Sequence, residues 1–165
     1  MTAHTGPHGA DRWDAAAARR IIETRRSEPG AMLPILHDLQ HAFGYVDASA
    51  VPDIADVLNV SRAEVHGVLT YYHDFRAKPA GRHVLKICRA EACQSMGARA
   101  LVDHVREAHG LALGQTAADG SITVEEVFCL GNCALSPAVL FDGELIGRVS
   151  AGDLDDLIAT AARDA

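Results

Sequence analysis

Two stretches decide the fold: His83-Val-Leu-Lys-Ile-Cys88-Arg-Ala-Glu-Ala-Cys93 and Ile122-Thr-Val-Glu-Glu-Val-Phe128-Cys129-Leu-Gly-Asn-Cys133. Each begins with a run typical of a β-strand and ends in a pair of cysteines. These four are the only cysteines of the chain, and 35 residues separate the two pairs. If the two strands are neighbours in one sheet, both pairs lie at the same edge and the four thiols can converge.

Paired cysteines brought together by folding form either a metal or iron–sulfur site or disulfides. The amino terminus has no cationic segment followed by an apolar core, so we expect no secretory signal. A cytoplasmic location follows as an expectation, and structural disulfides are rare there. The spacing alone fits a structural zinc ion and an iron–sulfur cluster about equally well. A dithiol oxidoreductase fits less well, because neither pair is Cys-x-x-Cys.

Composition excludes several classes of function. The chain has 165 residues and a formal net charge of −7, which disfavours binding to nucleic acid or to an anionic membrane surface. No apolar run approaches the roughly 18 uncharged residues of a membrane span, so we expect no membrane insertion. An ordinary apolar content allows a core of normal size.

The chain divides into a polar tail (1–10), a helical domain (11–75) and a second domain (76–165). Helices are predicted over 11–28, 32–43 and 48–59 from the spacing of apolar residues. Ser61 and Glu64 form a capping-box pattern that begins a fourth helix, which runs to about Tyr71. The first half is therefore predicted to be a small helical bundle.

The second half alternates between strand and helix patterns. Strands are predicted at 83–88, 122–128, 138–141 and 144–149, and helices at 95–109 and 153–163. This order resembles a thioredoxin-like layer, in which one sheet is covered by helices. The predicted fold class is α/β, with an N-terminal helical bundle followed by a thioredoxin-like α/β ferredoxin domain.

The predicted cysteine loops suit anionic sulfur. Gly97, Gly131 and Asn132 allow close backbone approach, so that amide hydrogens can point at the sulfurs. Lys86 and Arg89 are candidates for stabilising thiolate and an added electron.

The sequence also resembles a known family. The runs Cys88-Arg-Ala-Glu-Ala-Cys93-Gln-Ser-Met-Gly97 and Cys129-Leu-Gly-Asn-Cys133-Ala-Leu-Ser-Pro137 are similar to those of the thioredoxin-like 2Fe–2S subunits of NADH dehydrogenase modules, the 24 kDa type of respiratory complex I. Upstream segments such as Leu33-Pro-Ile-Leu and Ala63-Glu-Val-His-Gly-Val are similar too. The resemblance extends from about Ala15 to Ala162.

Within this family, the closest resemblance is to the gamma subunit of soluble, molybdenum-containing, NAD-dependent formate dehydrogenase. It is carried by Glu91-Ala-Cys-Gln-Ser-Met-Gly97 and by Val65-His-Gly-Val-Leu-Thr-Tyr-Tyr-His-Asp-Phe75. The resemblance implies an electron-transfer subunit with one 2Fe–2S cluster, ligated by Cys88, Cys93, Cys129 and Cys133. It implies a partner subunit with FMN, an NAD site and a 4Fe–4S cluster, and a large subunit that holds the molybdenum cofactor. The equivalent subunit of complex I or of an NAD-linked hydrogenase is the alternative.

The chain has no motif for a substrate site of its own. It lacks a G-x-G-x-x-G fingerprint after a strand and a phosphate loop, so we expect a non-catalytic electron carrier. An alternative of another class is a zinc-stabilised assembly module without redox function. His37 and His41 have the spacing of two ligands on one helix face, but no third ligand is evident, and a solvated helix face is expected.

Overall fold

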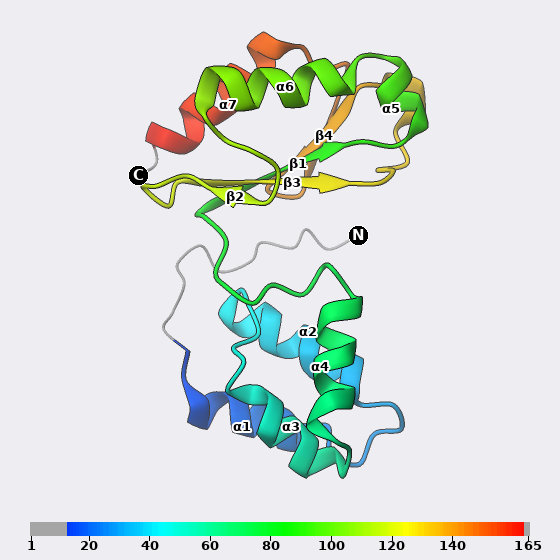
Figure 1. Cartoon of the computed structure of the whole chain (residues 1–165), viewed down its shortest axis with the longest axis vertical. Helices are drawn as coiled ribbons and strands as arrows, with labels where there is room; N and C mark the ends of the chain where they lie inside the picture. The colour runs from blue at the N-terminus through cyan, green and yellow to red at the C-terminus, as the bar shows by residue number, and fades with distance from the viewer. Residues whose placement is uncertain (1–12, 164–165) are drawn as a thin grey trace. The chain divides into compact units, whose positions relative to one another are not determined.

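The computed structural model describes residues 13–163 and divides into two units. The first unit, residues 13–79, contains four amphipathic helices. They are α1 (Ala15–Thr24), α2 (Met32–Phe43), α3 (Ala50–Leu58) and α4 (Arg62–Tyr71), shown in Figure 1. Their apolar faces meet in one core. Its largest fully buried side chains are Ile22, Ile35, Leu36, Leu39, Ile54 and Val65. The predicted tail, 1–10, lies outside the described residues.

The ends of these helices follow from local chemistry. Asp14 caps α1 by accepting hydrogen bonds from two amides of the first turn. The predicted capping box is present: the Ser61 hydroxyl accepts from the Glu64 amide, and the Glu64 carboxylate accepts from the Ser61 amide. Gly44 ends α2 in the left-handed conformation, with φ 77°. The predicted bounds of α2 are confirmed.

Two predicted helices are too long. The first was expected over 11–28, but the helix covers only Ala15–Thr24, and the chain turns at Arg25, whose amide bonds back to carbonyls of the last turn. The third was expected over 48–59. It ends at Leu58 because Asn59 has φ 52°, a left-handed conformation that stops a helix.

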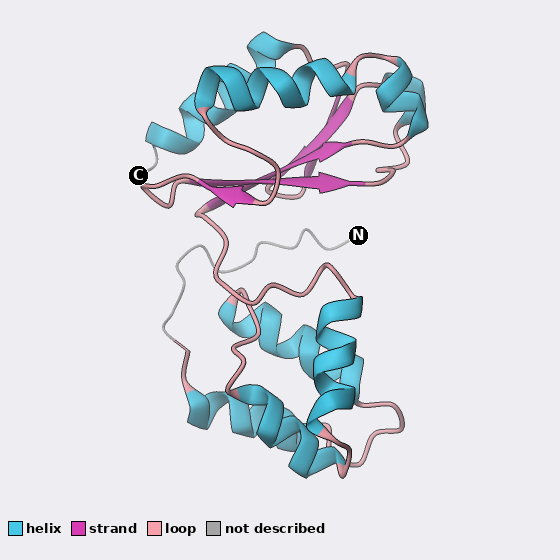
Figure 2. Cartoon of the chain, viewed as in Figure 1, coloured by secondary structure: helices cyan, strands magenta, loops and turns pink. Residues whose placement is uncertain are grey.

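The second unit, residues 80–163, contains a five-stranded sheet in the order β2-β3-β1-β4-β5. Its strands are β1 (His83–Cys88), β2 (Gln115–Thr116), β3 (Ile122–Val127), β4 (Ala138–Phe141) and β5 (Glu144–Gly147). β1 and β3 are parallel, and the other pairs are antiparallel. The sheet is therefore mixed, and the predicted α/β class is confirmed (Figure 2).

Helices α6 (Ala98–His109) and α7 (Ala151–Arg163) cover the same face of this sheet (Figure 1). Between them and the strands lies a second apolar core. It includes Leu85, Ile87, Ile122, Val124, Val105 and Leu154. None of the described helices is long and apolar enough to span a membrane.

The prediction of one helix over 95–109 is wrong. A short helix, α5 (Glu91–Ser95), comes first, and the chain then turns at Gly97, whose φ of 95° few other residues tolerate. The short strand β2 was not predicted. The hairpin of β4 and β5 is confirmed, although β5 ends at Gly147 rather than at Val149.

Candidate metal centre

Strand pairing brings the two cysteine segments together. Cys88 is the last residue of β1, and its partner in the parallel ladder is Val127, the last residue of β3. The pairing continues one residue further, because the Arg89 amide donates to the Val127 carbonyl at 2.8 Å. Both strands therefore end at the same edge of the sheet, and Cys129 follows only two residues after Val127.

The second cysteine of each pair lies on a short helical turn. Cys93 lies on α5, and Cys133 begins the 3-10 turn η1 (Cys133–Leu135). The sulfurs of Cys129 and Cys133 are 3.9 Å apart. All four thiols are free; those of Cys88 and Cys93 are buried, whereas Cys129 and Cys133 are exposed. The four cysteines, called the cysteine centre below, thus have one pair in the protein interior and one pair at the surface.

The Cys88 sulfur is surrounded by hydrogen-bond donors. Burial opposes ionisation of this thiol, but the hydrogen bonds outweigh it and lower the pKa of Cys88 below its ordinary value of 9.0. The donors are the thiol of Cys93 and the backbone amides of Ala90, Cys129 and Leu130. The site therefore favours a thiolate at this position.

The loop conformation explains how two of these amides reach the sulfur. Cys129 has φ 74° and Gly131 has φ 76°, so the loop passes through the left-handed region twice within three residues. A left-handed backbone is uncommon for a residue with a side chain. Such alternation turns successive N–H groups toward one point, which makes a concave anion-binding backbone. The expected role of Gly131 fits this geometry.

The other side of the centre disfavours an additional negative charge. A hydrogen bond with the Cys129 thiol, followed by the charge of that sulfur, raises the pKa of Cys133 above its ordinary value of 9.0. The charges of Cys93 and Cys88 act in the same direction. Four thiolates this close therefore need a cation among them, which is the chemical requirement of a metal ligand set.

Residues 13–163 include all four cysteines, and within that range no three cysteine sulfurs lie within 4.8 Å of one another. Cys129 and Cys133 thus form a close pair that no third sulfur joins within this distance.

Ser136 links the two halves of the centre and was missed in the sequence analysis. Its hydroxyl lies 3.6 Å from the Cys93 sulfur and donates to the Cys133 carbonyl at 2.7 Å. The side chain thereby connects α5 to η1. The only signal in the sequence is its place in the run Cys133-Ala-Leu-Ser-Pro137.

Lys86 and Arg89 both form ion pairs with acidic side chains. The Lys86 ammonium lies 3.6 Å from the Glu125 carboxylate, and the Arg89 guanidinium lies 2.6 Å from that of Glu126. Both cations are thus paired with acidic residues of the neighbouring strand β3. The interactions that lower the pKa of Cys88 are hydrogen bonds, from backbone amides and from the Cys93 thiol.

Apolar side chains lie next to the cysteines in the sequence. Leu130 packs against the buried pair and helps to keep water from it. Met96, Phe128 and Leu135, in contrast, are exposed. Exposed apolar side chains of this size beside a functional centre are typical of a surface that another protein covers.

The histidine pair on α2 is not part of a ligand cluster among the described residues. His37 packs its ring against Phe75, with ring centroids 5.1 Å apart. Both His37 and His41 are nevertheless exposed, as expected for a solvated helix face.

Comparison with known proteins agrees with the geometry. The family model described as thioredoxin-like 2Fe-2S ferredoxin matches residues 18–162. The chain is 36% identical to a subunit of the NADH-quinone oxidoreductase of Pseudomonas aeruginosa over 119 residues, 72% of either protein. It is 29% identical to HndA, a subunit of the NADP-reducing hydrogenase of Solidesulfovibrio fructosivorans, over 140 residues, 85% of this chain and 82% of that protein.

A solved structure has the same fold over most of the chain. An NAD+-reducing NiFe hydrogenase in the air-oxidized state matches with a TM-score of 0.68 and 25% sequence identity. The match covers 85% of this chain but only 24% of the hydrogenase chain, so the present chain spans about a quarter of that protein's length.

Proposed function

Because the chain belongs to the thioredoxin-like 2Fe-2S ferredoxin family, whose members carry a 2Fe–2S cluster, we propose that its four cysteines ligate one such cluster. The chain would then act as an electron-transfer subunit of an oxidoreductase complex. One observation carries the proposal: the parallel pairing of Cys88 with Val127, which brings Cys129 to the edge of the sheet where Cys88 lies. The proposed ligands are Cys88, Cys93, Cys129 and Cys133.

The arrangement of the sulfurs favours two irons over a single zinc ion. Four thiolates on one zinc ion would all lie about 3.8 Å apart, the edge of a tetrahedron with Zn–S bonds of about 2.3 Å. Here the sulfurs of Cys129 and Cys133 are 3.9 Å apart, but no third cysteine sulfur among the described residues lies within 4.8 Å of both. In a 2Fe–2S cluster each iron takes two of the four thiolates, which suits a close pair without a third sulfur beside it.

When bound, the cluster accepts and returns one electron. The contribution of the chain is to stabilise the anionic sulfurs with amides on the buried side and to exclude water there with Leu130. On the other side, Cys129 and Cys133 are exposed, so an electron has a short path to the surface. The exposed apolar residues Phe128 and Leu135 lie beside these two cysteines in the sequence and fit the core of a protein interface.

We propose an NAD-dependent formate dehydrogenase as the complex. Its flavin subunit, with an NAD site and a 4Fe–4S cluster, would exchange electrons with this chain, and a large molybdenum-containing subunit would oxidise formate. The run Glu91–Gly97, the run from Val65 to Phe75 and the Leu135-Ser-Pro137 ending support this choice. Relatives named as subunits of NADH-quinone oxidoreductase and of NAD(P)-reducing hydrogenases favour the alternative, the equivalent subunit of one of those complexes.

Purification of the intact complex distinguishes these assemblies. The chain is tagged in its native host and isolated with its partners, and the metals and activities of the preparation are measured. A formate dehydrogenase contains molybdenum and reduces NAD+ with formate. Nickel with hydrogen-dependent reduction, or NADH oxidation coupled to quinone, contradicts the assignment to formate dehydrogenase while leaving the electron-transfer role intact.

A further inference from the structure

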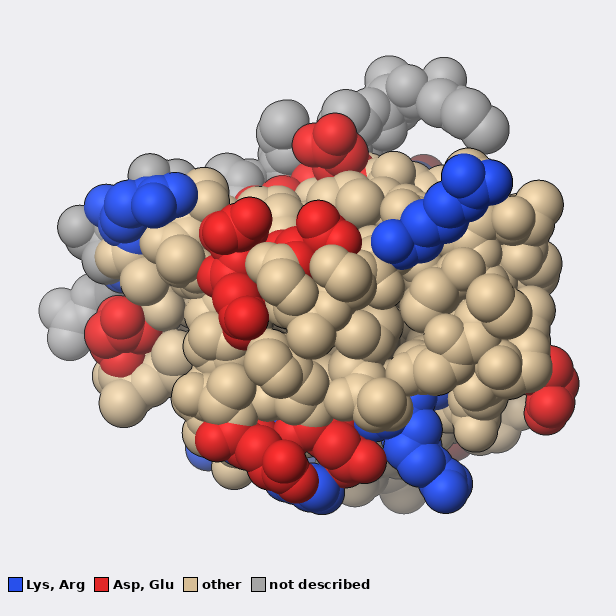
Figure 3. All heavy atoms as spheres, turned by 90° about the horizontal axis from the view of Figure 1, so that it is seen from above, with Lys and Arg blue, Asp and Glu red and all other residues tan. Residues whose placement is uncertain are grey.

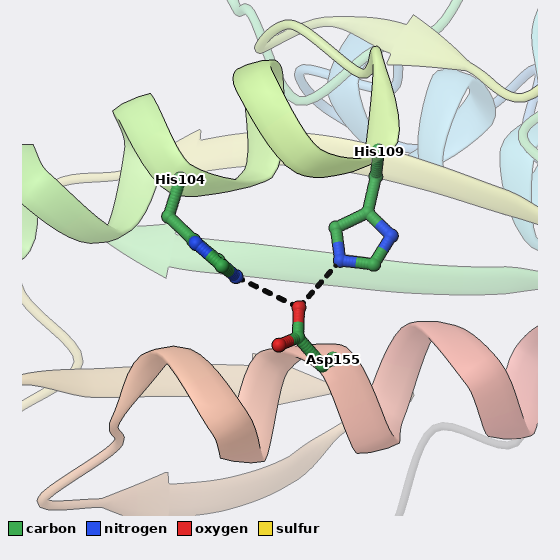
Figure 4. Close-up of side chains that lie close together, drawn as sticks. All are labelled: His104, His109 and Asp155. Carbon is green, nitrogen blue, oxygen red and sulfur yellow. Dashed lines mark hydrogen bonds and ion pairs between the residues drawn. The ribbon is translucent and has the colours of Figure 1, made fainter.

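Three potential metal ligands converge between α6 and α7, away from the cysteines. His104 and His109 are on α6, and Asp155 is on α7 (Figure 4). The Nε2 atom of His104 lies 2.7 Å from Oδ1 of Asp155, and that of His109 lies 2.6 Å from the same oxygen. All three ligand atoms lie within 4.8 Å of one another, and no other such group occurs among residues 13–163.

The two contacts, at 2.7 and 2.6 Å, are hydrogen bonds, and around a zinc ion with bonds of about 2.0–2.2 Å the same atoms would move apart to about 3.4 Å. Both imidazoles direct Nε2 at one carboxylate oxygen, so in the absence of an ion both nitrogens must carry a proton. An ion would replace these two protons and bind both nitrogens as neutral ligands. The side chains are 30%, 23% and 46% exposed, so an ion can reach them from solvent.

The surrounding charge also favours a cation. Figure 3 looks onto the side of the unit that carries α6 and α7, where Asp and Glu side chains form clusters. The acidic residues of these two helices are Asp103, Glu107, Asp153, Asp155 and Asp156. The same helices carry three arginines, Arg99, Arg106 and Arg163; of these, Arg106 is paired with Asp103 at 2.8 Å and with Glu107 at 3.6 Å.

We propose that His104, His109 and Asp155 bind one divalent transition-metal ion, and that the ion is zinc. Two imidazole nitrogens and one carboxylate oxygen are zinc ligands, and water completes the tetrahedron. Mg²⁺ and Ca²⁺ require sites made almost entirely of oxygen, and these imidazoles exclude them.

The ion would link two helices that no short loop connects. Asp155 on α7 is 46 residues from His109 and 51 residues from His104 in the sequence. An ion bound by all three would therefore connect α7 to α6 within the second unit. The helical rise puts His104 and His109 roughly 9 and 16 Å from Ala98, where α6 begins beside the α5 turn that carries Cys93. The zinc site is therefore separate from the cysteine centre, and it stabilises the fold rather than carrying electrons.

Zinc binding to the cluster-loaded full-length chain tests the proposal, since the cluster keeps the cysteines occupied. After removal of loosely bound metal with a mild chelator, zinc is titrated by calorimetry, and the bound ion is examined by zinc-edge X-ray absorption. We expect one zinc per chain with only nitrogen and oxygen neighbours, at about 2.0–2.2 Å.

Substitutions locate the site. Asp155→Asn keeps the size of the side chain, and His104→Gln keeps a polar side chain on the helix. If one of these variants is unstable, the other still tests the site. Each should weaken zinc binding roughly tenfold or more, because each removes a ligand. The control is the double variant His37→Gln/His41→Gln, which removes the closely spaced histidine pair of α2 and should bind zinc as the wild type does.

Several results would overturn the proposal. These are the absence of stoichiometric zinc in the wild type, sulfur neighbours at about 2.3 Å, which would place zinc on the cysteines, and unchanged affinity in both Asp155→Asn and His104→Gln. Loss of zinc in the control variant would move the site to α2.

Discussion

Gly147 of β5 is in direct contact with Leu135 of η1: a Cβ added to Gly147 would lie 2.7 Å from the Leu135 Cβ and 2.9 Å from its carbonyl oxygen. The same atom would lie 2.8 Å from the side-chain nitrogen of Asn132. The next residue, Arg148, donates its amide to the Leu135 carbonyl at 2.7 Å. The end of β5 thus packs against η1, the turn that begins with Cys133, and fixes its position.

We expect Gly147→Ala to loosen the cysteine centre. The added methyl group must push away backbone atoms of η1, and overpacking of this kind costs about 1–3 kcal/mol. The displaced turn should release iron faster, as loss of visible absorbance during a challenge with a chelator measures. Gly152→Ala is the matched control, since its Cβ would meet only the Ser150 hydroxyl, at 3.9 Å. Equal rates of iron loss in the two variants would refute the role given to Gly147.

Cys129→Ser should bleach or destabilise the centre. The substitution is nearly isosteric, so the loop can keep its conformation, but one iron loses a thiolate ligand. Iron content and the visible and magnetic spectra of the purified variant measure the effect. Spectra identical to those of the wild type would show that Cys129 is not a ligand.

Ser61→Ala should destabilise the helical unit by about 1 kcal/mol, because it removes the hydroxyl that caps α4. The only tryptophan of the chain, Trp13, reports on this unit: its ring centroid lies 4.6 Å from that of Phe43. Denaturant unfolding followed by tryptophan fluorescence therefore gives the change. Ser49→Ala is the control, because Ser49 precedes α3 without a capping bond. A destabilisation as large in Ser49→Ala as in Ser61→Ala would contradict the capping argument.

The same cap predicts a pH dependence. Hydrogen bonds from the amide and then the hydroxyl of Ser61 lower the pKa of Glu64 below its ordinary value of 4.5. A lowered folded-state pKa stabilises the fold above the ordinary pKa, and this stabilisation is lost as the pH falls through the folded value. Glu64→Gln should therefore unfold at lower denaturant than the wild type at pH 7, with a smaller difference near pH 3. A difference that stays constant over this range would show that ionised Glu64 does not contribute.

Elements with strong local signals were predicted well from the sequence. The bounds of α2 are right because Pro29-Gly30 and Gly44 mark its two ends, and those of β1 are right because turn residues precede a short apolar run. The two-part α5 and α6 were not foreseen. Gly97 can occupy a helix or a left-handed turn, and only the folded chain decides between them.

The cysteines of the centre could be named from the sequence, but not their supporting contacts. The spacing of the cysteines and the order of the predicted strands along the chain can be read from the sequence directly. Gly147 meets Leu135, and Ser136 meets Cys93, only because distant segments pack together. The same is true of Asp155, which is 51 residues from His104 and whose acidic neighbours in the sequence look like an ordinary helix start. Tertiary contacts of this kind leave no periodic pattern to read.

The metal content of the anaerobically purified chain tests the central claim most directly. The account predicts a brown protein with equal amounts of iron and acid-labile sulfide, two of each per chain, and an S = 1/2 electron paramagnetic resonance signal after one-electron reduction. A colourless protein with one zinc ion on the four cysteines, and no labile sulfide, would contradict it.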